Sequence, residues 1–325
     1  MELVLNTFGT SLQVEDGLFL VVHKDGKQSI EPAKVKSILI SKGARISSDA
    51  ALLAIENEID VMFVDKMGKP AGRVWSIKYG SISTIRRKQL DFLYTPFAVK
   101  WIKEVVRQKI DNQIGFLLTM MPEEQRLKNI VDRSIGKQQD YKKKIEGADA
   151  PFISDIAPTI RGWEGAASKA YFDALAELLP EKYRFEVRSQ HPAKDVFNCL
   201  MNYGYGMLYG KVEGALIKAG IDPYAGIFHR DEYNRPALVY DVIELYRVWI
   251  DYVVFNLCTQ DVIDEDCYSI NQEGSYWLEN MGKRILIQSV NDYLDEIINL
   301  KGVHRSRMVH IELYAQQLAQ KFLKS

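Results

Sequence analysis

Four side chains in the second half of the sequence have types and spacings that suit metal chemistry. Asp241 and Glu244 lie three residues apart in the apolar stretch YDVIELYR, and His229 lies twelve residues before Asp241. Glu164 lies among small residues in the segment GWEGAASKA. One histidine with two or three carboxylates suits Mg²⁺ or Mn²⁺ better than Zn²⁺. The sequence therefore indicates a divalent metal site that could polarise a phosphate and activate a hydroxyl.

The same acids also fit an ordinary structural interpretation. Arg161 or Lys169 could form an ion pair with Glu164, and Arg247 could form one with Asp241. Two carboxylates three residues apart on a buried helix repel each other unless a cation lies between them. If the acids bind a metal, removing one should relieve repulsion and preserve the stability of the metal-free protein. If they are structural, removing one should destabilise the fold, and spacing alone leaves both interpretations open.

The elements that must position these residues fall into two regions of different periodicity. Residues 1–78 form short segments rich in Val, Ile and Leu, with the hairpin dipeptides Asp16–Gly17 and Asp25–Gly26, and one helical segment, SSDAALLAIENEI. Beyond this region apolar residues recur every three or four positions, which is typical of helices. We predict an α+β protein with a small β-rich domain (1–78) followed by a larger all-α catalytic domain (79–325).

Charge and composition restrict the possible partners and location. The formal net charge of −1 argues weakly against a nucleic-acid partner, but charge distribution matters more than the sum. Basic residues cluster in four segments, which are IRRKQ, GKQQDYKKK, KYRFEVR and KGVHRSR. Three cysteines without close spacing argue against a disulfide framework, and no apolar run reaches the length of a membrane span. The first residues also lack the basic region of a signal peptide, so we expect a cytoplasmic protein with no membrane association.

The order and spacing of several longer segments point to one family. The segments are ISSDAALLAIENEIDVMFVDKMGKPAGRV, IRGWEGAASKAYF, NYGYGMLYGKVEGALIKAGIDPYAGIFH and PALVYDVIELYR. Together they make the chain resemble, almost end to end, the CRISPR-associated spacer-acquisition integrase, also described as the universal adaptation endonuclease. One departure is visible, because many members have proline after the arginine of the last segment, whereas Val248 follows Arg247 here.

The resemblance implies roles for the four candidate catalytic residues. The family's metal ligands fall on Glu164, His229 and Glu244, and its assisting aspartate falls on Asp241. The implied cofactor is Mg²⁺ or Mn²⁺.

Three further residues are candidates for DNA binding. Tyr209 matches a family tyrosine near the active site, although a role in packing between helices fits equally well. Arg161 and Arg188 are the basic residues nearest in sequence to the site segments. Which of the basic clusters contact DNA stays open.

The activity implied by the resemblance is metal-dependent insertion of foreign DNA fragments into a CRISPR array. The 3′-hydroxyl of a captured fragment would attack a phosphodiester of the repeat. The implied assembly contains double-stranded DNA, a homodimer formed through the β domains, and a small ferredoxin-like adaptation partner that completes a heterohexamer. Two alternatives are a stand-alone, structure-selective DNA repair nuclease and a non-catalytic helical scaffold with structural acids.

Overall fold

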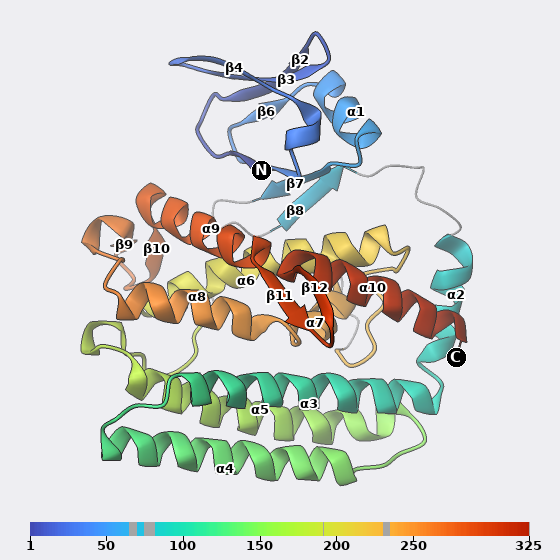
Figure 1. The fold of residues 1–325 in the computed structure, drawn as a ribbon, viewed down its shortest axis with the longest axis vertical. Coiled ribbons are helices and arrows are strands. Elements are labelled where there is room, and N and C mark those ends of the chain that lie inside the picture. Colours follow the sequence, from blue (N-terminus) through green and yellow to red (C-terminus); the bar gives the residue numbers. More distant parts are fainter. Residues whose placement is uncertain (65–69, 75–81, 191, 230–234, 325) are drawn as a thin grey trace. The chain divides into compact units, whose positions relative to one another are not determined.

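The computed structural model describes residues 1–64, 70–74, 82–190, 192–229 and 235–324 of the chain. These residues divide into two compact units, Met1–Gly80 and Ser81–Ser325, which we describe separately (Figure 1). The domain boundary predicted at residues 78 and 79 lies outside the described residues.

The first unit contains two four-stranded sheets, as expected for a β-rich region. One sheet has parallel strands β1 (Glu2–Leu5), β5 (Ser37–Ser41) and β7 (Asp60–Val64), followed by antiparallel β8 (Pro70–Val74). The other has the order β4 (Gly26–Ile30), β3 (Leu18–His23), β2 (Ser11–Glu15) and β6 (Arg45–Ile46). The predicted helix is α1 (Ser48–Glu56), and the Ser47 hydroxyl caps it by accepting from the Ala50 amide at 3.1 Å. The prediction of a β-rich N-terminal region is confirmed.

The two predicted hairpin dipeptides behave differently. Asp16 and Gly17 both adopt positive φ angles, 50° and 75°, and connect β2 to β3 through a two-residue turn. In the next hairpin His23 pairs with Gly26, so Lys24 and Asp25 form the turn. The prediction of a turn at Asp25–Gly26 is therefore displaced by one residue, because Gly26 is the first residue of β4.

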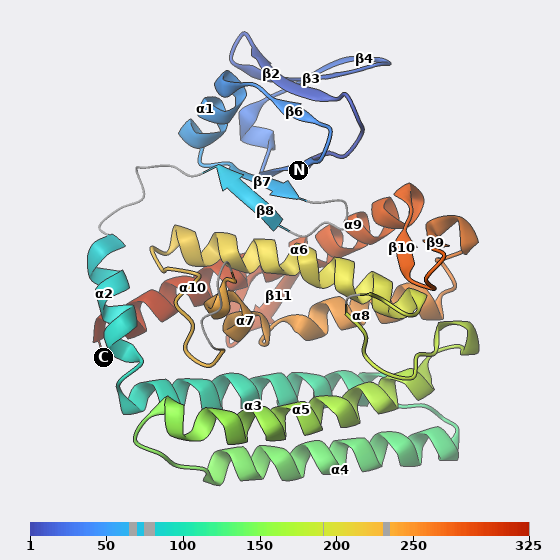
Figure 2. The same ribbon diagram turned by 180° about the vertical axis from the view of Figure 1, so that it is seen from behind.

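The second unit is mainly helical. Its core is built from apolar residues that recur every three or four positions along the helices. Its longer helices are α2 (Ile82–Phe92), α3 (Pro96–Thr119), α4 (Gln125–Gly147), α5 (Ile153–Leu178), α6 (Val196–Lys218), α7 (Ala237–Ile243), α8 (Arg247–Thr259), α9 (Asn280–Asp295) and α10 (Arg307–Lys324). Within this unit α3, α4 and α5 pack side by side, and α6 and α7 lie next to one another (Figure 2). Within the described part of the chain, no helix is long and apolar enough to cross a membrane.

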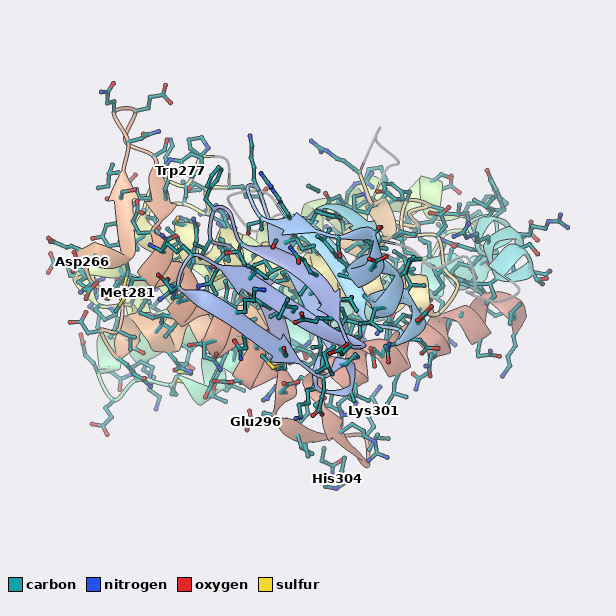
Figure 3. All side chains as sticks on the ribbon, turned by 90° about the horizontal axis from the view of Figure 1, so that it is seen from above. Asp266, Trp277, Met281, Glu296, Lys301 and His304 are labelled. Atoms are coloured by element: carbon teal, nitrogen blue, oxygen red, sulfur yellow. The ribbon has the colours of Figure 1, made fainter. Side chains whose placement is uncertain are left out.

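The prediction that this unit is all-α is wrong in one respect, because it contains two short hairpins. They are β9 (Tyr268–Ile270) with β10 (Tyr276–Leu278), and β11 (Ile297–Leu300) with β12 (Val303–Ser306). Lys301 and Gly302 form the turn of the second hairpin with φ angles of 52° and 84°, and Lys301 and His304 mark this hairpin in Figure 3. Strands of three or four residues are too short to show a clear alternation in sequence.

Candidate metal centre

Two acids near the end of α7 point to different partners. The sequence placed Asp241 and Glu244 on one continuous helix, but α7 ends at Ile243 and Glu244 occupies its C-cap position. The side-chain amide of Asn112, in α3, donates to the Leu245 carbonyl at 2.9 Å just beyond this end. The break lets each carboxylate reach a separate set of groups.

Asp241 is fully buried and organises the loop that carries His229. The amides of Ile227, Phe228 and His229 all donate to its carboxylate at 2.7–2.9 Å. The His229 Nδ1 atom lies 2.6 Å from Asp241 Oδ1. Because a carboxylate only accepts hydrogen bonds, Nδ1 carries the proton and donates it. In a neutral imidazole Nε2 is then the lone-pair nitrogen, which is the arrangement found in metal-ligating histidines backed by a carboxylate.

Glu164 and Glu244 converge on a lysine that the sequence interpretation did not include. Lys109 Nζ forms ion pairs with Glu164 Oε1 and, at 2.5 Å, with Glu244 Oε2. The Ser168 hydroxyl also donates to Glu164 Oε1 at 2.9 Å. The Lys109 side chain is 9% exposed, whereas those of Glu164 and Glu244 are 22% and 12% exposed. Two carboxylates from α5 and from the end of α7 therefore lie within reach of a single cation.

Arg247 is a second cation beside Glu244. Its Nε donates to Glu244 Oε1 at 2.8 Å, and its Nη2 donates to the Tyr209 hydroxyl at 2.8 Å. Its guanidinium also lies over the Tyr205 ring, 4.6 Å from the centroid. The Tyr205 hydroxyl in turn donates to buried Asp251 at 2.6 Å. Arg247 is thus fixed by one acid and two tyrosines.

The electrostatics of this cluster follow from burial and opposite charge. Burial raises the pKa of Glu244, but the charges of Arg247 and Lys109 outweigh burial and lower the pKa below its ordinary value. Burial lowers the pKa of Lys109, but the charges of Glu244 and Glu164 outweigh this, and the pKa lies above its ordinary value. Glu244 and Lys109 are consequently both charged at neutral pH.

The ordinary ion pairs considered for the acids take other forms here. Arg161 donates to the Phe228 carbonyl at 2.6 Å, and Lys169 pairs with Asp173 at 2.8 Å. Arg247 pairs with Glu244 rather than Asp241. The contact between Arg161 and the residue before His229 brings α5, which carries Glu164, against the histidine loop.

The remaining DNA-binding candidates make contacts inside the helical unit. The Arg188 guanidinium donates to Asn198 and Asn202 at 2.6 and 2.7 Å, and lies over the Tyr205 ring. The Tyr209 ring packs edge-on against Tyr240, and its hydroxyl accepts from Arg247. These contacts explain how both side chains are held, and their roles toward DNA stay predictions.

The family of this chain follows from comparison with known proteins. The family model for CRISPR associated protein Cas1 matches residues 3–292. The chain belongs to the Cas1 family. It is 32% identical to the CRISPR-associated endonuclease Cas1 1 of Archaeoglobus fulgidus, over 98% of this chain and 95% of that protein. The Cas1 family comprises CRISPR-associated DNA endonucleases that act in spacer integration, as the sequence resemblance predicted.

Solved structures show the same fold at lower identity. A casposase bound to integration product matches with a TM-score of 0.84 and 18% identity, over 100% of this chain and 91% of that one. A chain of a Cas6-RT-Cas1–Cas2 complex matches with a TM-score of 0.82 and 21% identity, over 100% of this chain and 35% of that one. The Cas1 fold therefore extends over the whole chain.

The chemistry of the donor set fits a divalent ion. Two carboxylates and an imidazole nitrogen match the ligands that Mn²⁺ accepts, and the carboxylates suit Mg²⁺. Glu244 Oε2 is buried, and its partner among the described residues is the Lys109 ammonium at 2.5 Å. In the described parts of the chain, no three acidic, histidine or cysteine side chains are already gathered at metal-binding distance. The side chains fit the ion, but some of them must shift to bind it.

Lys109 is the residue of the candidate site that sequence reasoning missed. It lies on the buried stripe of α3, at the spacing that joins Val105 to Phe116, and Gln113 follows it on the same stripe. Polar residues at the core positions of an amphipathic helix are the signal that could have identified it.

Proposed function

We propose that this Cas1-family chain joins foreign DNA fragments to a CRISPR repeat by transesterification. The 3′-hydroxyl oxygen of the fragment forms a new bond to phosphorus. The bond between phosphorus and the repeat strand's 3′ oxygen breaks, and that oxygen leaves as a hydroxyl, so the proton lost by the attacking hydroxyl is balanced by the proton that the leaving oxygen gains. One phosphodiester replaces another, so the reaction requires no energy cofactor. The observation that carries this proposal is the convergence of Glu164 and Glu244, from separate elements, on one cation position.

The roles we assign to the site residues follow from their contacts. Glu164, Glu244 and His229 Nε2 hold Mg²⁺ or Mn²⁺, and Asp241 fixes the orientation of the imidazole. When bound, the ion polarises the phosphate and lowers the pKa of the attacking hydroxyl. Arg247 holds one oxygen of Glu244 and thereby directs the other toward the site.

The proposed partners are double-stranded DNA, a second copy of this chain and a small ferredoxin-like protein in a heterohexamer. The fold shared with a chain of a Cas6-RT-Cas1–Cas2 complex supports the protein partner, and the fold shared with a casposase bound to integration product supports the DNA. Arg161, Arg188 and Tyr209 are proposed DNA-positioning residues. A cytoplasmic location is part of this proposal.

A strand-transfer assay tests the proposal. A duplex with free 3′-hydroxyls is incubated with repeat DNA and Mn²⁺ or Mg²⁺, with and without the partner protein. We expect metal-dependent joining, and a loss of about a thousandfold or more for Glu164→Gln, because metal stabilisation of transition-state charge is worth several kcal/mol. Asp173→Asn is the matched control, since Asp173 is an exposed acid of the same helix.

Two results would contradict the proposal in different ways. Cleavage of branched DNA without joining, in the presence of the partner, would favour a stand-alone repair nuclease. A Glu164→Gln protein that joins DNA in proportion to its folded fraction would favour structural acids.

A further inference from the structure

Lys109 brings a buried positive charge into the centre of the proposed metal site. Its ammonium contacts one oxygen of Glu164 and one oxygen of Glu244, and the side chain is almost completely buried. Arg247 binds the other oxygen of Glu244, whereas the Ser168 hydroxyl donates to the same Glu164 oxygen that Lys109 contacts. Glu164 Oε1 and Glu244 Oε2 are therefore the two oxygens at the cation position. Lysine and a divalent ion therefore compete for the same atoms.

The physical reason for a lysine here is the cost of buried acids. A buried carboxylate without a counter-charge is strongly unfavourable, and Glu244 lies beside a second acid. One ammonium between the two acids compensates both of them in the absence of metal. An ion bound at about 2.0–2.6 Å from both oxygens would need the space and the lone pairs that the ammonium uses.

We propose that Lys109 is a built-in placeholder cation, which holds Glu164 and Glu244 in the metal-free protein and must release them before a divalent ion binds. The inference rests on the proposed metal site. Lys109 thereby lowers the affinity of the site for metal and supports the fold when no metal is bound.

The contrast between Lys109 and Arg247 explains which of the two cations leaves its carboxylate when a divalent ion binds. Arg247 is planar and is fixed by Glu244, by the Tyr209 hydroxyl and by the Tyr205 ring. Lys109 has a flexible four-carbon chain that ends in a point charge, so its head can move without moving the helix. Lys109 is therefore the cation that leaves when the ion binds, and Arg247 keeps its hydrogen bond to Glu244 Oε1.

The test is a calorimetric Mn²⁺ titration of the full-length protein without DNA, combined with melting in a chelator. We expect Lys109→Met to bind Mn²⁺ at least about tenfold more tightly than the wild type, because a competing unit charge is removed. The same variant should melt earlier than the wild type in the chelator and recover with Mn²⁺. Lys169→Met, which removes an exposed charge from α5, is the matched control and should change neither quantity.

A second substitution keeps the test decisive if Lys109→Met fails to fold without metal. Lys109→Arg retains the charge and offers a planar fork to both carboxylates, so it should bind Mn²⁺ more weakly than the wild type. Equal or weaker Mn²⁺ binding by Lys109→Met, or unchanged binding by Lys109→Arg, would overturn the inference.

The failure of this inference can be told from failure of the metal site itself. If the wild type binds no Mn²⁺, the proposed metal site is wrong and the placeholder role fails with it. If the wild type binds Mn²⁺, Glu164→Gln loses it and Lys109→Met matches the wild type, only the role of Lys109 is wrong.

Discussion

Asp241 and Glu244 lie three residues apart at the end of α7, yet the first is held by backbone amides and a histidine ring and the second by Lys109 and Arg247. The Asp241 carboxylate accepts hydrogen bonds from three backbone amides and from the His229 ring. Glu244 pairs with Arg247 and Lys109. Backbone amides cannot be exchanged without unfolding the loop, whereas a side-chain cation can be replaced by another cation. The histidine half of the site is therefore preorganised, and the carboxylate half is open to exchange.

The largest expected effect is a difference in the stability lost when each of the two acids that share Lys109 is replaced. Glu244→Gln should destabilise the metal-free protein by about 3–5 kcal/mol, because it leaves Arg247 and Lys109 with less opposing charge in a buried site. Glu164→Gln should cost roughly 1 kcal/mol, since Glu164 is more exposed and Lys109 keeps Glu244. This replaces the expectation, drawn from sequence, that loss of either acid preserves stability.

Urea unfolding in a chelator measures this difference between the two glutamates. Asp173→Asn serves as the control for loss of an acidic charge from α5. Equal destabilisation by the two glutamine substitutions would contradict the assignment of Glu244 as the more strongly coupled acid.

A third acid sharpens the comparison through its pH dependence. Asp251 accepts from the Tyr171 and Tyr205 hydroxyls, and burial raises its pKa to about 6 despite these hydrogen bonds. Because the folded-state pKa exceeds the unfolded value of about 3.9, the folded protein holds more protons between these values. The stability from this group is present below about pH 4 and is lost as pH rises through about 6.

Replacing Asp251 with asparagine should remove this pH dependence. From about pH 4 to about pH 7 the stability of the wild type should fall by roughly 2–3 kcal/mol relative to Asp251→Asn. Urea unfolding of both proteins at the two pH values measures the change. A stability difference that stays constant across this range would show that Asp251 does not titrate as assigned.

The smallest effect concerns the histidine half of the site. Asp241→Asn keeps the size of the side chain but presents an amide to the loop that carries His229, so the imidazole loses its fixed orientation. We expect a loss of about 10–100-fold in Mn²⁺ affinity, as for other groups that orient metal-binding histidines. Calorimetric titration measures this affinity. An affinity equal to that of the wild type would show that Asp241 does not orient a metal-binding histidine.

The fold was predictable where periodicity and turn chemistry act locally. The strands of the first unit and the helix α1 follow from short-range patterns. The end of α7 at Ile243 was not predictable, because the stretch IELYR contains neither glycine nor proline. The Asn112 side-chain amide donates to the Leu245 carbonyl just beyond this helix end. Asn112 is far away in the sequence, so no local pattern indicates this contact.

Spacing and family resemblance proposed Glu164, His229 and Glu244 as metal ligands, and that assignment stays a prediction. The structure adds a charge that the sequence interpretation lacked. The cation between the two acids comes from α3, 55 residues before Glu164, and only tertiary packing brings Lys109 there. Side-chain pairings across such separations leave no trace in helical or strand periodicity.

The most direct measurement of the central claim is anomalous diffraction from crystals of this protein soaked in Mn²⁺. We predict one strong peak per chain that contacts Glu164 Oε1, Glu244 Oε2 and His229 Nε2, with the Lys109 ammonium moved away from both carboxylates. A peak at other residues, or the absence of a peak with Lys109 still bridging Glu164 and Glu244, would contradict the account.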